Sequence, residues 1–160
     1  MILRFPEDED LLAWEVANNK VVFTNGCFDI LHPGHLAVVR QCVRRAKDMF
    51  GIVVIGVNSD HSVGMLKGSG RPIFDETHRT RLLNSFRDVS VVVIFEGPDL
   101  LDLINVVNPK VVIKGGDYKH DEIIAGEAKV EIVPFVDGHS TTKIIDEIAR
   151  MENLGNHEKD

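Results

Sequence analysis

Several kinds of residue are scarce in this sequence, and each shortage excludes a class of protein. Among 160 residues only Cys27 and Cys42 are cysteines, so the chain has no disulfide framework of the kind that stabilises small secreted domains. No apolar run reaches the roughly 20 residues that a membrane-spanning helix requires. The N-terminal residues show no basic segment followed by an apolar one, so no secretory signal is visible and a cytoplasmic location is expected.

The sequence also lacks an excess of positive charge. It has 18 Lys and Arg residues against 25 Asp and Glu residues, which gives a formal net charge of -7 and a pI of about 5.5. Proteins that bind nucleic acids or anionic membranes normally need a broad basic surface. We therefore expect neither nucleic acid nor membrane as a partner. A single nucleotide is not excluded, because it requires only a few cations and backbone N–H groups.

Short apolar runs rich in β-branched residues alternate with helical patterns along the whole chain. The runs are typical of buried parallel strands, and the helical patterns have apolar residues three and four positions apart. This alternation predicts an α/β fold, a three-layer Rossmann-like sandwich with a five-stranded parallel sheet. The expected strands are at 20–25, 51–57, 89–95, 110–114 and 129–135. The expected long helices are at 34–50, 76–87, 98–107 and 141–151.

Length and composition are those of a single domain. With 44% hydrophobic residues, the 160-residue chain can form one core. We expect one domain over residues 1–160, with its core at about 20–150. Residues 1–19 are expected to form an N-terminal helical extension, and the polar residues 152–160 a flexible tail. In a fold of this class, ligands bind beyond the carboxyl ends of the strands, where the strand order reverses.

The segment TNGCFDILHPGH (24–35) connects the first expected strand to the first long helix. His32 and His35 are three residues apart at the helix entrance, so both imidazoles can lie on one side, beside the unpaired N–H groups. Such a pair can hold an anion and stabilise the charge on the oxygens of a five-coordinate phosphorus during nucleotidyl transfer. A surface pair or a metal site remains an alternative for the spacing alone.

A metal held by protein ligands is not expected. The zinc-protease motif needs two histidines four residues apart and a glutamate, which this segment does not have. The spacing of Cys27 and Cys42 matches no zinc framework, and Cys42 falls within the apolar pattern of the helix. Both cysteines are therefore interpreted as structural from their spacing.

This segment and several later ones together resemble a known family. TNGCFDILHPGH is similar to the HxGH motif of the cytidylyltransferase-like nucleotidyltransferases. The later segments occur in the order found in bacterial ADP-heptose synthases, specifically in their heptose 1-phosphate adenylyltransferase half. The resemblance covers about residues 20–146. The later segments are VNSD (57–60), LKGSGRP (66–72), Arg79, KGGDY (114–118) and DGHSTTKII (137–145).

The resemblance implies a role for individual residues. Its catalytic residues would be His32, His35, Lys67 and Arg79, with the histidines on the triphosphate. Its nucleotide-binding residues would be Gly26, Cys27, Phe28, Gly115, Gly116, Ser140, Thr141 and Thr142. Its acceptor-binding residues would be Asp29, Arg71 and Asp117. Arg87 is a weaker candidate for the phosphates.

Most of these residues also have an ordinary structural interpretation. Asp29 is of a type that caps turns, and the two glycines at 115–116 are of a type that forms tight ones. The cations of the loop at 66–72 can be solvated side chains. The hydroxyl residues 140–142 at a helix entrance can be N-caps, or they can form an anion site with the free N–H groups. The sequence leaves these alternatives open.

The resemblance implies an enzyme that transfers AMP from Mg-ATP to a sugar 1-phosphate, D-glycero-β-D-manno-heptose 1-phosphate, giving ADP-sugar and pyrophosphate. Mg²⁺ would be carried by the triphosphate. The sugar-kinase half that is fused in many bacterial members is absent from these residues, so a kinase step would belong to another protein. Relatives with this fold commonly form homodimers. The stretch 119–136 is shorter than in typical heptose enzymes, which leaves the acceptor and the dimer contact open.

Two other functions remain as alternatives. The first is cytidylyl transfer from CTP to glycerol 3-phosphate or a related polyol phosphate. Those enzymes usually carry an arginine shortly before STT, where this chain has Val136 and Asp137, and this favours adenylyl transfer. The second is a regulatory module that binds a nucleotide without turnover. The extended set of cations argues against such a module, because a sensor has less need to hold a leaving pyrophosphate.

Overall fold

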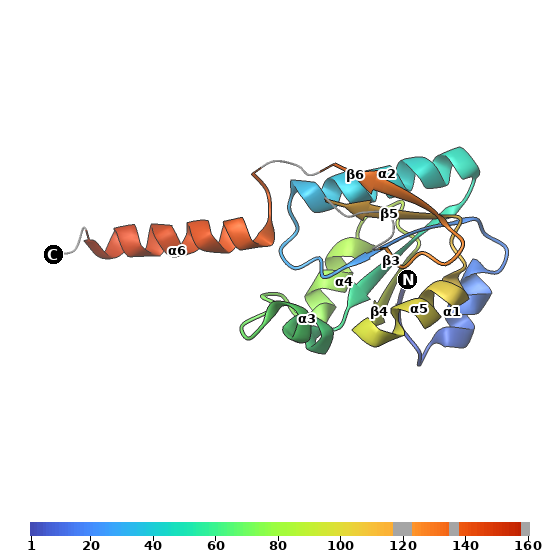
Figure 1. Cartoon of the computed structure of the whole chain (residues 1–160), viewed down its shortest axis with the longest axis horizontal. Helices are drawn as coiled ribbons and strands as arrows, with labels where there is room; N and C mark the ends of the chain where they lie inside the picture. The colour runs from blue at the N-terminus through green and yellow to red at the C-terminus, as the bar shows by residue number, and fades with distance from the viewer. Residues whose placement is uncertain (117–122, 135–137, 158–160) are drawn as a thin grey trace.

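A single parallel sheet forms the centre of the molecule (Figure 1). The computed structural model describes residues 1–116, 123–134 and 138–157. Within these residues the sheet has six strands in the order β1-β4-β3-β2-β5-β6. The strands are β1 Ile2–Arg4, β2 Val21–Gly26, β3 Ile52–Asn58, β4 Val91–Phe95, β5 Val111–Gly115 and β6 Lys129–Val133. The α-helices are α1 Glu9–Val16, α2 Pro33–Met49, α3 Asp60–Lys67, α4 Glu76–Asn84, α5 Leu100–Val107 and α6 Thr141–His157.

The α/β class and the parallel sheet are confirmed, but the expectation of five strands is wrong. The additional strand is β1, which pairs with β4 at the edge of the sheet, Leu3 opposite Val93. Three residues are too few to show a strand period, so the sequence pattern did not indicate it. The strand forms because its neighbours bury apolar side chains: Leu3 and Phe5 are each only 5% exposed.

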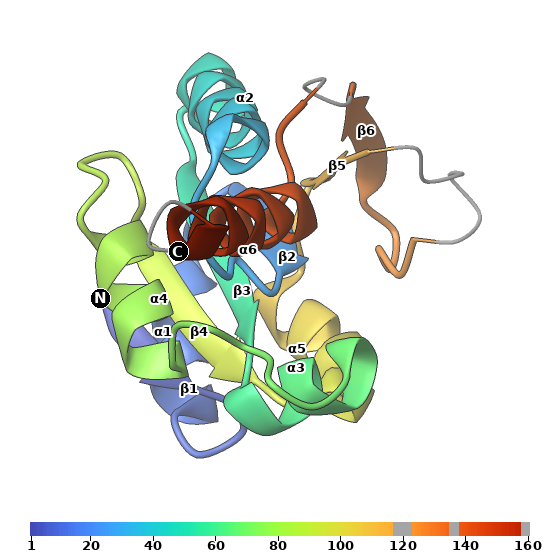
Figure 2. The same ribbon diagram turned by 90° about the vertical axis from the view of Figure 1, so that its left-hand side faces the viewer.

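Helices cover both faces of the sheet, which gives the three expected layers. Alternate residues of each buried strand point to opposite faces, so Val22 and Phe23 belong to different core clusters. The cluster around Phe23 includes the buried faces of α1 and α5, and the cluster around Val22 includes those of α2 and α4. Figure 2 shows α2 and α4 on one side of the sheet and α5 on the other.

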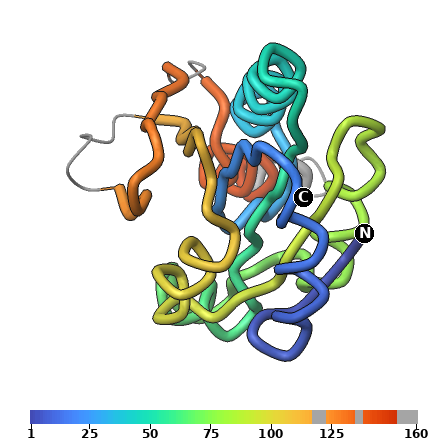
Figure 3. Tube along the Cα trace, turned by 90° about the vertical axis from the view of Figure 1, so that its right-hand side faces the viewer, coloured from blue at the N-terminus to red at the C-terminus, as the bar shows by residue number. Residues whose placement is uncertain are grey.

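The two ends of the chain differ from the sequence prediction. Residues 1–19 were expected to form an N-terminal helical extension; α1 is such a helix, but β1 belongs to the sheet, and Leu12 and Val16 of α1 belong to the core. At the other end, α6 continues to His157 through much of the expected flexible tail, and residues 158–160 lie outside the described part. This helix extends away from the sheet, seen from the side in Figure 1 and along its axis in Figure 3.

The helix α3 was not predicted from the sequence. Its eight residues, DHSVGMLK, include a glycine and few apolar side chains, so the helical period is weak. Its start is nevertheless defined by an N-cap, because the Ser59 hydroxyl accepts a hydrogen bond from the N–H of Ser62 at 3.0 Å. In the part of the chain that the structure describes, none of the helices combines the length and apolar character needed to cross a membrane.

Candidate active site

The strand order reverses between β2 and β5, and this reversal locates the candidate site. From β2 the chain proceeds to β3 and β4 on one side, then returns to the other side of β2 for β5 and β6. The carboxyl ends of β2 and β5 are Gly26 and Gly115. Ligands of open α/β sheets bind at such a point. The residues that follow β2 are therefore the first to consider.

The imidazole of His32 caps helix α2. Its Nδ1 accepts a hydrogen bond from the backbone N–H of Gly34 at 3.1 Å, so the proton of the neutral ring is on Nε2. This cap also explains the glycine of the HPGH motif. A Cβ at position 34 would lie 2.9 Å from His32 Cε1, closer than the two atoms can approach. The helix start therefore holds one imidazole with a single N–H donor available.

The two predicted histidines are in direct contact. The rings of His32 and His35 stack with centroids 3.8 Å apart and an interplanar angle of 28°, and the Phe28 ring lies 5.2 Å from that of His35. Burial, followed by the neighbouring His32, lowers the pKa of His35 to about 4. Burial, followed by His139, also lowers the pKa of His32. At pH 7 the pair is therefore neutral and acts through N–H donors, not through a fixed positive charge.

The entrance of α6 lies beside this pair of histidines. The Thr141 hydroxyl donates a hydrogen bond to the backbone carbonyl of Asp29 at 3.3 Å. The Ser140 hydroxyl accepts one from the N–H of Lys143 at 3.2 Å and so caps the helix, while Thr142 is exposed. The structure thus brings together the HPGH segment and the STT segment, which are separated by more than 100 residues. Two helix starts then lie next to one another, and a helix start is a place where anions bind.

Asp29 does not have a free carboxylate. Its side chain is buried and forms an ion pair with Arg71, with 2.7 Å between Arg71 Nη2 and Asp29 Oδ2. It also accepts hydrogen bonds from the backbone N–H groups of Ile73 and Phe74, each at 3.0 Å. Both residues were expected to bind the acceptor, and that role stays a prediction. In this structure they pair with each other and fasten the loop before α4 to the turn after β2.

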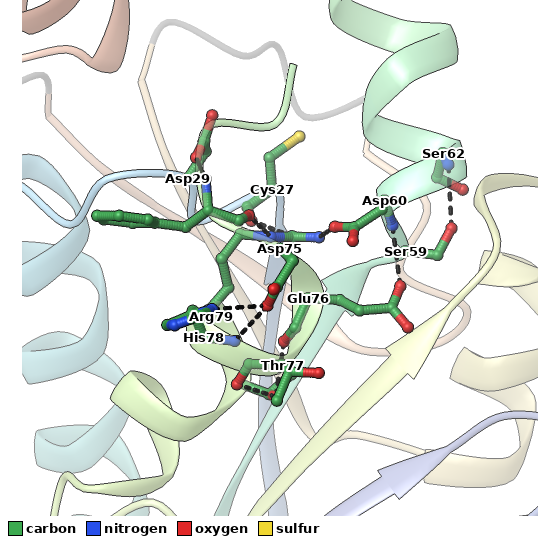
Figure 4. A network of polar contacts seen from close by, with 12 residues as sticks. Cys27, Asp29, Ser59, Asp60, Ser62, Asp75, Glu76, Thr77, His78 and Arg79 are labelled. Carbon is green, nitrogen blue, oxygen red and sulfur yellow. Dashed lines mark hydrogen bonds and ion pairs between the residues drawn. The ribbon is translucent and has the colours of Figure 1, made fainter. Parts of the chain in front are cut away.

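Arg79 was predicted to be a catalytic residue, but its side chain lies beneath the turn after β2. It is fully buried. Its three nitrogens donate to the carbonyl of Phe74 at 2.9 Å, to the carbonyl of Cys27 at 2.6 Å and to Asp60 Oδ1 at 2.7 Å, and Figure 4 shows Arg79 between Cys27 and Asp60. A guanidinium with all its nitrogens paired beneath the site cannot also hold phosphates in this arrangement. Arg79 acts through Cys27, whose carbonyl it holds in place. Asp60 of the VNSD segment is the charged partner of Arg79, and this pairing was not recognised in the sequence.

The turn held by this network has an unusual backbone. Phe28 has a φ of 50° and Ile30 a φ of 44°, both in the left-handed region that residues other than glycine seldom adopt. Such conformations persist only where surrounding contacts impose them, and they gather at functional sites. Here the contacts are those of Arg79 with Cys27 and of Thr141 with the Asp29 carbonyl. The turn is therefore preorganised before any ligand binds.

The glycines at the end of β5 have structural reasons of their own. A Cβ on Gly115 would lie 2.6 Å from Val38 Cγ2, so the close packing of α2 on β5 requires glycine. Gly116 has a φ of 117°, which L side chains rarely adopt. Glycine is less strictly required at position 26, at the end of β2, because a Cβ there would lie 3.5 Å from the Phe28 ring, an ordinary contact distance. Nucleotide binding by these glycines stays a prediction, and Asp117 lies outside the described residues.

The remaining predicted cations occupy different places. Lys67 is exposed at the last position of α3. Burial of the Cys27 thiol raises its pKa, and the positive charge of Lys67 opposes this rise. A catalytic role for Lys67 stays a prediction. Arg87 is exposed and borders a surface hollow together with Gly51 and Ser90, which precede the amino ends of β3 and β4. The structure does not bring Arg87 to the site.

Two residues near the site were not singled out from the sequence. His139 precedes the STT residues, and its backbone carbonyl would be 3.9 Å from a Cβ at Gly34. Lys114 donates a hydrogen bond to the backbone carbonyl of Asn25 at 2.8 Å. A lysine inside the apolar run KVVIK was the available signal, because a charge in a buried strand is costly unless it is paired. Its contact with β2 depends on tertiary structure and was not visible.

No metal cage is found within the residues that the structure describes. No group of three or more His, Cys, Asp or Glu side chains is arranged there to hold an ion. The carboxylates beneath the turn are already paired, Asp29 with Arg71 and Asp60 with Arg79. The expectation that Mg²⁺ is carried by the triphosphate therefore stays a proposal.

Solved structures support the fold. The lipopolysaccharide core biosynthesis protein from Thermoplasma volcanium superposes with a TM-score of 0.57 at 25% identity, over 74% of this chain and 98% of that one. Pantothenate synthetase from Thermus thermophilus superposes with a TM-score of 0.58 at 19% identity, over 80% of this chain and 60% of that one. The second likeness concerns the fold alone.

Curated relatives are more similar in sequence. The chain is 42% identical over 144 residues to the bifunctional protein HldE of Geobacter metallireducens, which covers 86% of this chain and 29% of that protein. It is 45% identical over 138 residues to the bifunctional protein HldE of Hyphomonas neptunium, which covers 82% and 28%. The chain spans less than a third of the length of these relatives. The family model of cytidylyltransferase-like proteins matches residues 23–154, so this chain belongs to the cytidylyltransferase-like family of nucleotidyltransferases.

Proposed function

We propose that this chain transfers AMP from Mg-ATP to a sugar 1-phosphate, D-glycero-β-D-manno-heptose 1-phosphate, and releases pyrophosphate. The observation that carries the proposal is the stacked pair of His32 and His35 at the start of α2, beside the entrance of α6. Two neutral imidazoles and two neighbouring helix starts suit a triphosphate. The similarity to the HldE proteins over most of this chain and the order of its motifs support the choice of ATP and heptose phosphate.

The reaction needs no protein nucleophile. An oxygen of the acceptor phosphate is already ionised and attacks the α-phosphorus, while the bond to the pyrophosphate oxygen opposite it breaks. His32, through Nε2–H, and His35 donate to oxygens whose charge grows in the transition state, so their hydrogen bonds strengthen there. Mg²⁺ carried by the triphosphate would neutralise charge on the leaving phosphates. The held turn after β2 and the α6 entrance supply positioning.

A pyrophosphate-release assay tests this proposal. Four nucleoside triphosphates are each combined with heptose 1-phosphate, glycerol 3-phosphate and other sugar phosphates. We expect turnover with ATP and heptose 1-phosphate. Turnover of CTP with glycerol 3-phosphate would support the cytidylyl alternative, whose sequence signal at residues 136–137 lies outside the described residues. Binding of ATP without pyrophosphate release in any combination would support a regulatory module and contradict the proposal.

The two histidines can be tested in the same assay. His35→Ala removes one donor and its ring contact with His32, and we expect pyrophosphate release to fall by at least a hundredfold, as for the loss of a transition-state donor. His61→Asn is the matched control, because His61 is an exposed histidine on α3 whose ring is 79% exposed. We expect it to keep wild-type activity. Turnover of His35→Ala at the wild-type rate would contradict the assignment.

The expected homodimer remains a prediction. The projecting helix α6 exposes Ile148 and Met151, which are 58% and 61% exposed. Sedimentation of the purified chain measures its oligomeric state directly.

A further inference from the structure

Lys114 lies where two neighbouring strands separate. The pairing between β2 and β5 covers Val22 with Val111 and Phe23 with Val112. Beyond these pairs β2 stays paired with β3 as far as Gly26, and β5 stays paired with β6 as far as Gly115. The carboxyl ends of β2 and β5 therefore follow different neighbours, and at such a point of strand reversal the ligands of open α/β sheets bind in a crevice.

The side chain of Lys114 joins the carboxyl ends of β5 and β2. Its Nζ donates to the backbone carbonyl of Asn25 at 2.8 Å and to Asn25 Oδ1 at 3.1 Å. The backbone hydrogen bonds between β2 and β5 have ended before Asn25 and Lys114. The ammonium of Lys114 therefore links the two strands where their backbones no longer do, through a side chain that can change conformation. Burial lowers the pKa of Lys114 to about 8. Lys114 remains mostly charged, and removing its ammonium from water costs free energy. If the contact only joined the strands, a pair of apolar side chains would do so without this cost.

Asn25 is the residue through which this contact reaches the site. It directly precedes the turn that begins at Gly26 and contains Phe28, whose ring contacts His35. Arg79 holds the Cys27 carbonyl from the other side of the turn. Thr141 of α6 holds the Asp29 carbonyl, further along the turn. The Lys114 contact is the one that joins the start of the turn to β5.

We propose that Lys114 is a positioning residue for nucleotide binding: through Asn25 it fixes the width of the crevice between β2 and β5 and the turn after β2. The inference rests on the proposed function, since it names a further determinant of the same site. It predicts weaker binding of the triphosphate when the contact is lost.

The test compares Lys114→Met with Lys110→Met. Lys110 is a matched control because it is an exposed lysine just before the amino end of β5, far from the crevice. We expect Lys114→Met to raise the Kd of Mg-ATP, measured by calorimetry without acceptor, and the KM for ATP, each by about tenfold, in line with the loss of a charged hydrogen bond. Lys110→Met should change neither. Mg-CTP is titrated in parallel.

Asn25→Ala provides a second line of evidence, which remains usable if Lys114→Met does not fold. If Lys114 acts through Asn25, the double variant should raise the Kd by less than the product of the two single effects. Lys114→Arg, which keeps a charged donor, should recover part of the affinity. A Lys114→Met protein with a lower melting temperature but wild-type Kd and KM would overturn the inference, and so would fully additive effects. Failure of the wild type to bind any triphosphate would instead overturn the proposed function.

Discussion

The two sides of the candidate site differ in how firmly they are held. The turn after β2 is fixed from beneath by the buried guanidinium of Arg79 and by the ion pair of Asp29 with Arg71. The entrance of α6, on the other side, is joined to that turn by the hydroxyl of Thr141, and the rest of the helix extends away from the sheet. One side is thus preorganised, and the other is held mainly at its first turn. The comparison teaches that the buried charges here position backbone, so under the proposed function contact with the ligand falls to the neutral imidazoles and the helix starts.

The largest expected effect is the loss of the buried guanidinium. Arg79→Met leaves Asp60 and the carbonyls of Cys27 and Phe74 without their donor, and we expect it to destabilise the fold by about 3 to 5 kcal/mol. Urea unfolding followed by circular dichroism measures this change. Arg81→Met, an exposed arginine on the same helix, is the control and should stay within about 0.5 kcal/mol of wild type. A wild-type midpoint for Arg79→Met would show that the network does not hold the turn.

A smaller effect is expected from the buried histidine, and it depends on pH. Because the pKa of His35 is lowered to about 4, the unfolded chain binds more protons than the folded one between about pH 6.5 and pH 4. The free energy of unfolding therefore falls as the pH decreases through this window, and stability is fully present above it. We expect His35 to account for about 2 kcal/mol of this loss, less than the full linkage value because the ring is partly exposed.

The measurement is urea unfolding of wild type and His35→Asn at several pH values. The difference between the two proteins isolates His35 from the carboxylates, which titrate in both. His61→Asn controls for an exposed histidine. The same slope in wild type and His35→Asn would show that the ring is not held neutral. In that case His35 would not be a neutral donor on the preorganised side of the site, and the contrast between neutral donors and buried charges would not hold there.

Local signals allowed part of this site to be predicted from the sequence. The HPGH segment lies between a strong strand and a strong helix, so His32 and His35 could be placed at a helix entrance beyond a strand end. The pairings of Asp29 with Arg71 and of Arg79 with Asp60 could not be predicted, because they join residues 42 and 19 positions apart through the fold. Both arginines were therefore expected to point at ligand.

Edge and short elements were missed for the same reason. The three residues of β1 form a strand only because β4 offers an unpaired edge and the core accepts Leu3. The helix α3 depends on its Ser59 cap more than on an apolar pattern. In each case tertiary contacts supply what the local pattern lacks.

The smallest expected effect lies on the less firmly held side. Ser140→Ala removes the hydroxyl that accepts from the N–H of Lys143, and loss of such a cap costs about 1 kcal/mol of helix stability. Because α6 extends from the body, we expect this cost to appear as faster amide exchange in the first turn of α6, with an unchanged urea midpoint. Thr142→Ala, an exposed neighbour in the same turn, is the control and should exchange like wild type. A midpoint shift approaching that of Arg79→Met would mean that the entrance of α6 is as firmly built into the body as the turn after β2, and the distinction between the two sides would not hold.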